Sequence, residues 1–143
     1  MRKIGVFIIF FIVSVVTYCV NFSVSPTKFE VDLSKNNIFE VHLLNNTSKP
    51  LRLEVYTEIP VGYEDSNLND NIVIFPKKVS IKPGGKKEVR FKVEAIENKE
   101  KKNFKTLLVF RERLPNLIGE SKKGNINMEL GFITEIAIGV YGK

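Results

Sequence analysis

Few side chains in this 143-residue sequence are of the kinds that carry out chemistry. His42 is the only histidine and Cys19 the only cysteine, so no second imidazole or thiol is available for a metal site or a nucleophile–base pair. His42 stands within an alternating apolar run, where it is interpreted as an ordinary strand residue. We therefore predict that the protein is not an enzyme and has no metal site and no cofactor.

Two further segments resemble ligand sites only loosely. Glu64, Asp65 and Asp70 supply carboxylates, but they lack the regular ligand spacing of a calcium loop, so solvated loop charge is the better interpretation. Gly84 and Gly85 follow Pro83 between two predicted strands and do not precede a helix. They predict a turn and exclude a phosphate-binding loop.

The formal net charge of +6 is mild, and most lysines are scattered between acidic residues. The longest basic run, residues 99–102, is short and has no interleaved aromatic residue on which a base could stack. We predict a solvated loop there and no nucleic-acid partner.

Residues 1–20 have the pattern of a targeting segment. Arg2 and Lys3 precede an almost wholly apolar run over residues 4–16, as in the charged and apolar regions of a secretory signal. As a helix this run spans roughly 20 Å, less than the ~30 Å hydrocarbon core of a bilayer. A cleaved signal peptide and a periplasmic or otherwise extracytoplasmic protein are predicted. Extension of the run to Val20 reaches the lower limit of a spanning helix, so an inner-membrane anchor is the alternative.

Residues 21–143 show short alternating apolar runs separated by turn residues, and no long helical periodicity. One apolar face per strand requires a second sheet to cover it, so the pattern predicts an all-β domain of seven strands in two packed sheets. A closed barrel is the alternative. The predicted strands are residues 22–33 with a break at Pro26, 38–44, 51–57, 72–81 with a break at Pro76, 88–94, 104–110 and 126–141.

The order and spacing of six segments carry a family resemblance: residues 22–29, 45–50, 74–84, 88–91, 110–115 and 136–141. Together they resemble the N-terminal immunoglobulin-like domain of periplasmic pilus (fimbrial) chaperones. The resemblance covers nearly all of residues 21–143 and implies a seven-stranded immunoglobulin-like β-sandwich. The sequence corresponds to the first of that family's two domains.

The resemblance also implies a binding mode. In that family the last strand lends alternate apolar side chains to a pilin subunit that lacks a strand of its own. The matching residues here are Met128, Leu130 and Phe132, with the alternative that all three face their own sandwich. The family holds the subunit's C-terminal carboxylate with two basic residues. Lys28 matches the first position and Ala137 the second, which removes that charge.

These observations predict an exported single-domain protein, similar to pilus chaperones, that binds a pilin-like or envelope protein subunit by edge-strand donation during cell-envelope or fimbrial assembly. The alternative is a structural interaction module of a cell-envelope complex without chaperone activity. It would contact the membrane only if residues 1–20 are not cleaved.

Overall fold

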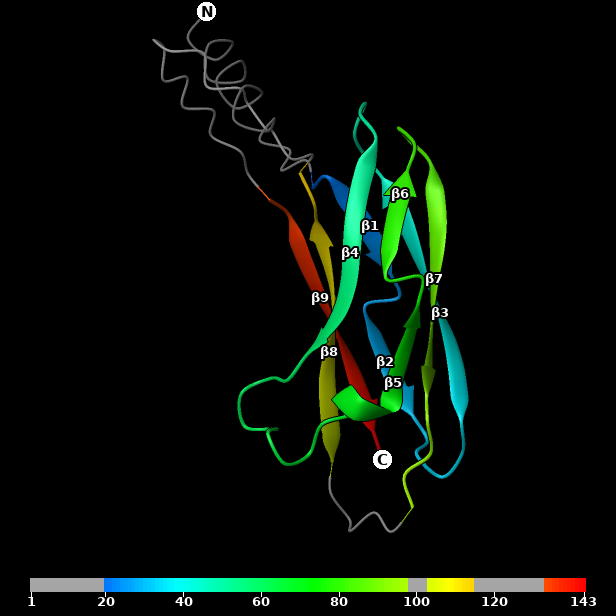
Figure 1. The fold of residues 1–143 in the computed structure, drawn as a ribbon, viewed down its shortest axis with the longest axis vertical. Coiled ribbons are helices and arrows are strands. Elements are labelled where there is room, and N and C mark those ends of the chain that lie inside the picture. Colours follow the sequence, from blue (N-terminus) through cyan, green and yellow to red (C-terminus); the bar gives the residue numbers. More distant parts are fainter. Residues whose placement is uncertain (1–19, 98–102, 115–132) are drawn as a thin grey trace, which may run out of the picture.

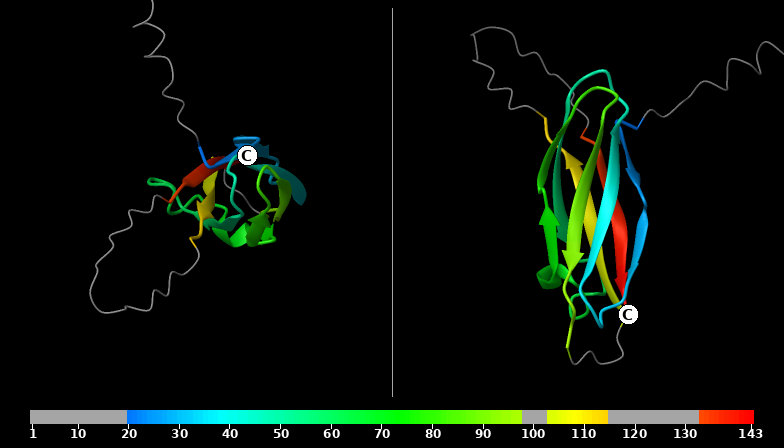
Figure 2. Two further views of the ribbon diagram at one scale, coloured as in Figure 1. Left: turned by 90° about the horizontal axis from the view of Figure 1, so that it is seen from above. Right: turned by 90° about the vertical axis from the view of Figure 1, so that its right-hand side faces the viewer.

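The computed structural model describes residues 20–97, 103–114 and 133–143 (Figure 1). In these ranges the chain forms two β-sheets with the strand orders β1-β3-β7-β5 and β2-β9-β8-β4-β6. The sheets face each other as the two layers of a sandwich (Figure 2). The elements are β1 (Phe22–Ser25), β2 (Lys28–Val31), β3 (Asn37–Asn45), β4 (Leu51–Glu58), the 3-10 turn η1 (Asn69–Asn71), β5 (Ile72–Phe75), β6 (Lys78–Ile81), β7 (Lys86–Val93), β8 (Phe104–Glu112) and β9 (Glu135–Gly142).

Alternation along the strands produces the core, as the sequence predicts. Val41 and Leu43 of β3 and the odd-numbered apolar residues of β7 are at most 1% exposed, whereas their even-numbered neighbours face outward or are only partly covered. Phe29, Phe39 and Phe91 meet in the interior with ring centroids 5.0 to 5.3 Å apart. The immunoglobulin-like sandwich is therefore confirmed. No helix in the described residues is long and apolar enough to cross a bilayer.

The described residues contain nine strands, not the predicted seven, because two predicted runs each form two strands. Proline has no N–H group to donate to a ladder, so pairing stops at Pro26 and again at Pro76. At each point the chain leaves the four-stranded sheet and enters the five-stranded one, as β1 followed by β2 and as β5 followed by β6. The Ser25–Pro26 and Phe75–Pro76 bonds are both cis.

The connection between β4 and β5 is partly buried. Leu68 is fully buried, and its backbone N–H donates a hydrogen bond of 2.7 Å to the Thr106 hydroxyl, which is also buried. Asn71 N–H donates to Leu68 C=O and closes the η1 turn. The segment from residue 60 to 71 therefore packs on β8 through one apolar side chain.

Candidate functional site

Lys28 lies on the outer face of the five-stranded sheet, where β2 runs parallel to the end of β9. Its partner in the register is Gly139. The Lys28 ammonium lies 3.2 Å from Glu30 Oε1 and 5.0 Å from the centroid of the Tyr141 ring, and 58% of the side chain is exposed. The amine can therefore reach a carboxylate of a partner, though Glu30 competes for it.

Gly139 allows the Tyr141 ring to lie over the strand. A Cβ atom at Gly139 would stand 2.6 Å from Tyr141 Cε2, closer than side chains tolerate. Lys105 of β8 lies opposite Tyr141 in the register, and its ammonium is 5.2 Å from the ring centroid. Tyr141 thus attracts two ammonium groups to this face through its ring electrons.

Lys105 supplies a second positive charge at a position that the family resemblance did not identify. Ala137, at the family's second basic position, is exposed on the neighbouring strand β9 but carries no charge. Lys105 forms no salt bridge within the described ranges. The alternation of residues 104–110 could have placed Lys105 on the outer face of its strand. Its position opposite Tyr141 depends on the register of β8 and β9, which the sequence alone does not show.

β9 is an interior strand at its end and an edge strand at its beginning. Its register with β8 extends over Glu135–Gly142, whereas its register with β2 covers only Gly139 to Gly142. The second half of β9 is closed to a partner strand, because β2 lies beside it in the same sheet. From Glu135 to Ile138 the described residues provide a strand neighbour on one side only.

Side chains of two neighbouring strands hold the beginning of β9. Arg111 Nε lies 3.7 Å from Glu135 Oε2, and the Tyr56 hydroxyl donates to the same oxygen at 3.3 Å. Desolvation of the phenol, together with the nearby carboxylates of Glu135 and Glu58, raises the pKa of Tyr56. The open part of β9 is thus fixed in place on its covered side.

Three of the four predicted site residues, Met128, Leu130 and Phe132, lie outside the described residues. Their part in binding stays a prediction. Ile136 and Ile138, which have the same parity in the sequence, face the sandwich core.

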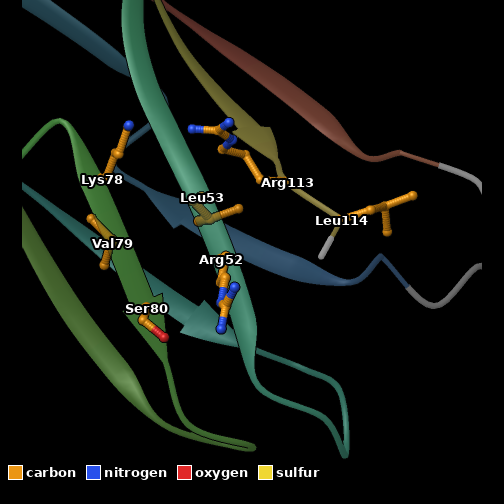
Figure 3. Close-up of a pocket in the computed structure, with 7 residues that line it drawn as sticks. All are labelled: Arg52, Leu53, Lys78, Val79, Ser80, Arg113 and Leu114. Atoms are coloured by element: carbon orange, nitrogen blue, oxygen red, sulfur yellow. The ribbon is translucent and has the colours of Figure 1, made fainter. Parts of the chain in front are cut away.

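A basic hollow of about 350 Å³ lies on the same outer face, between β4, β6 and the end of β8. Lys78 and Arg113 extend toward each other across β4, while Arg52 points away from them (Figure 3). Arg113 Nε is 3.7 Å from Glu54 Oε2. Arg52 and Lys78 form no salt bridge with the described residues, so the hollow has an excess of positive charge.

On the opposite face of the molecule, His42 stands between two carboxylates. Glu40 lies 3.8 Å from its Nε2 and Glu88, opposite in the register, lies 3.5 Å from its Nδ1. Arg90 Nε also lies 3.1 Å from Glu40. Because the carboxylates contact different ring nitrogens and one of them is paired with arginine, this group is an exposed charge network. The sequence showed the alternation but not the register that brings Glu88 to His42.

No protein-family model matches the sequence, and no curated protein matches it. Solved structures do match its fold. The periplasmic chaperone SfaE is 12% identical with a TM-score of 0.61, over 85% of this chain and 57% of the chaperone. The Salmonella enterica complex of the SafA pilin with the SafB chaperone matches at 7% identity and a TM-score of 0.61, over 89% of this chain and 56% of that one.

This chain spans little more than half the length of the chaperones it matches. WR4, a member of the MSP family from Caenorhabditis elegans, is 11% identical with a TM-score of 0.58, and the match covers 87% of this chain and all of WR4. At these identities the comparisons define the fold. The described residues have the immunoglobulin-like fold of the N-terminal domain of periplasmic pilus chaperones.

Proposed function

We propose that this protein is an exported, chaperone-like protein that binds a protein subunit by edge-strand donation during cell-envelope or fimbrial assembly. The observation that carries the proposal is the beginning of β9, where the described residues give Glu135 to Ile138 a strand neighbour on one side only. Unpaired N–H and C=O groups at such an edge are free to pair with a strand of another chain. The proposed role is binding without catalysis.

The donated strand would extend from this edge toward Met128, Leu130 and Phe132. Alternate apolar side chains of one parity can enter a groove of the subunit while the backbone pairs with the groove walls. Lys28 would neutralise the subunit's C-terminal carboxylate as a point charge, since lysine lacks the bidentate fork of arginine. Lys105 on the same face would add a second positive charge, in place of the one missing at Ala137.

The test is a pull-down of the tagged full chain from its own cells, with bound subunits identified by mass spectrometry. We expect Leu130→Asp and Phe132→Asp each to lose the bound subunit, because a carboxylate cannot enter an apolar groove without a large desolvation cost. Asn127→Asp, which changes a residue of the opposite parity, is the matched control and should keep it. Equal recovery of the subunit with all three variants, each folded by circular dichroism, would refute strand donation.

Export is a separate part of the proposal and has its own test. SfaE, which shares this fold, is a periplasmic chaperone, and residues 1–20 have the pattern of a secretory signal. Mass spectrometry of the N-terminus of the protein from its own cells should show a chain that begins near residue 20. An intact N-terminus in the membrane fraction would show an anchor instead.

The second candidate is a structural module of a cell-envelope complex without chaperone activity. The match to WR4 covers the whole of WR4, so a chain with this fold can consist of one domain. A structural module would stay with its partner in the mature assembly, whereas a chaperone leaves it. Detection of the protein in purified surface assemblies would favour the module.

A further inference from the structure

The end of the sandwich at which the described chain begins is built from two turns that one buried side chain holds together. Asn45 is fully buried, and its amide donates to the backbone carbonyls of Lys49 at 2.8 Å and of Lys82 at 3.1 Å. The Asn45 N–H also donates to Gly85 C=O at 3.0 Å. The turn between β3 and β4 and the turn between β6 and β7 therefore lie side by side, at the end of the sandwich opposite the C-terminus (Figure 2, right).

This end, which we call the basic end, has an excess of positive charge. The basic side chains of the two turns and of the first residues of β4 and β7 are exposed and form no salt bridge with a described residue: Lys49, Arg52, Lys82, Lys86 and Lys87. Nearby carboxylates are already engaged. Glu112 accepts a hydrogen bond of 3.0 Å from the Asn21 amide, and Glu135 pairs with Arg111. Arg52 also lines the basic hollow, so the positive charge continues onto the outer face of the five-stranded sheet.

The described loops at the opposite end have the reverse charge balance. They carry mainly carboxylates: Asp32, Glu64, Asp65, Asp70, Glu94 and Glu97. Salt screens charges beyond about 8 Å at physiological ionic strength, so a charged surface responds to the end that it faces and not to the net charge of the chain. An anionic surface is therefore attracted to the basic end.

The chain enters the sandwich at the basic end. Asn46, in the turn between β3 and β4, donates from its N–H to Asn21 C=O at 3.0 Å and from its amide to Val20 C=O at 3.2 Å. The sequence before Val20 contains the almost wholly apolar run of residues 4–16, which has the pattern of a segment that enters a bilayer. A lipid bilayer is thus the surface that the chain's own sequence brings to this end.

Apolar side chains lie among the charged groups of the basic end. Val20, Leu114 and Ile133 are 49%, 45% and 47% exposed. Glu112 joins the segments that carry them, because its carboxylate accepts from Asn21 and its N–H donates to Thr134 C=O at 2.9 Å. Basic side chains together with partly exposed apolar ones are the combination with which proteins bind at the boundary between lipid headgroups and acyl chains.

We propose that the basic end docks on a bilayer that contains anionic phospholipids, with the side chains of the two turns on the lipid phosphates. Each lysine or arginine close to such a surface raises the affinity about fivefold. The inference goes beyond the proposed function and does not depend on it, since strand donation uses the backbone edge of β9 and docking uses the turns at the end of the sandwich.

Sedimentation of the full chain with lipid vesicles tests the proposal. The quantity measured is the partition coefficient on vesicles of phosphatidylcholine with phosphatidylglycerol, divided by that on phosphatidylcholine alone, so that the apolar run contributes equally to both. Lys49→Glu combined with Lys82→Glu should lower this ratio at least about tenfold. Lys35→Glu combined with Lys92→Glu is the matched control. It makes the same change in net charge away from the basic end, and should keep the ratio within about twofold.

Two outcomes of this experiment overturn the proposal, provided that circular dichroism shows both double variants to be folded. An unchanged ratio in the Lys49 and Lys82 variant would show that the turns do not contact lipid, and equal losses in both variants would show a response to net charge alone. Binding to soluble polyglutamate without a preference for anionic vesicles would assign the basic end to an acidic protein and would also overturn it.

A fluorescent label gives a second test that leaves every charge in place. In the full chain with Cys19→Ser, an environment-sensitive fluorophore on Ser48→Cys, in the turn between β3 and β4, should brighten more on the anionic vesicles than on the neutral ones. Ser34→Cys, in the exposed turn at the opposite end, carries the same label as the control and should not respond. Equal responses of the two labels would show that the basic end does not face the bilayer.

Discussion

The two places where the chain crosses between the sheets make an instructive pair. At Pro26 the chain passes from β1 to β2, and at Pro76 from β5 to β6. β1 and β5 are the two edges of the four-stranded sheet, and β2 and β6 are the two edges of the five-stranded sheet. Each crossing therefore joins the two layers along one margin of the sandwich, and both margins are joined by continuous chain.

The crossings differ in what they leave open. β2 covers only the last half of β9, so among the described residues the beginning of β9, with Glu135 and its register partner Arg111, stays open. β6 covers only Leu51 to Glu54 of β4 and leaves the uncharged β5 at the margin. A crossing between the sheets thus leaves an open strand edge with charged residues at one margin, on β9, and an uncharged open edge at the other, on β5.

A phenylalanine beside each crossing gives the largest expected contrast. Phe29 follows the first crossing, is 8% exposed and packs on Phe39 and Phe91, whereas Phe75 precedes the second and is 77% exposed. Phe29→Ala should lower the free energy of unfolding by about 3–5 kcal/mol through the lost burial and the cavity. Phe75→Ala should change it by about 0.5 kcal/mol or less. Urea unfolding at low protein concentration measures both, and equal losses would mean that the two crossings do not differ in this way.

Two adjacent asparagines sharpen the comparison, because each connects β3 to a different margin. Asn45 is fully buried, and its amide donates to the carbonyls of Ile81 and Lys82 at the end of β6. Asn46 is exposed, and its amide donates to the Ser23 hydroxyl of β1. Asn45→Ala leaves buried carbonyls without a donor and should cost about 1–3 kcal/mol of unfolding free energy.

Asn46→Ala is the matched control for that change. Water can replace its hydrogen bond, so the expected loss is about 0.5 kcal/mol or less. Thermal unfolding of the two variants at one pH measures the difference. A larger loss for Asn46→Ala would indicate that the β1 margin, and not the β6 margin, depends on this turn.

Period-two alternation was sufficient to predict the core faces and the sandwich. Phe29 and Val31 alternate with charged residues in the sequence, and both are buried. The prolines were visible as breaks, but a proline also occurs within a single edge strand or at a bulge. The sequence therefore could not show that the halves lie in different sheets, because that depends on which strand each half meets.

The candidate site was less predictable for the same reason. Lys28 was identified by resemblance, whereas Lys105 shares its face only because β8 and β9 pair with Lys105 opposite Tyr141. The extent of the open edge on β9 likewise depends on how far β2 reaches. Contacts that arise from register between distant segments leave little trace in a single sequence.

Tyr56 gives the smallest expected effect and lies between the two openings. Its hydroxyl donates to Glu135 at the beginning of β9, and the residue also lines the groove beside β5. Its pKa is raised in the folded chain by desolvation and then by Glu135 and Glu58, so as the pH rises the unfolded chain loses this proton first. The stabilisation is complete below about pH 10, the ordinary pKa of tyrosine, and is lost as the pH rises through the pKa of Tyr56 in the folded chain.

Tyr56→Phe should remove this part of the alkaline loss of stability, measured by unfolding at a series of pH values. Tyr63→Phe is the control, and an unchanged alkaline slope in the Tyr56 variant would show that the phenol at the β9 opening does not sense Glu135.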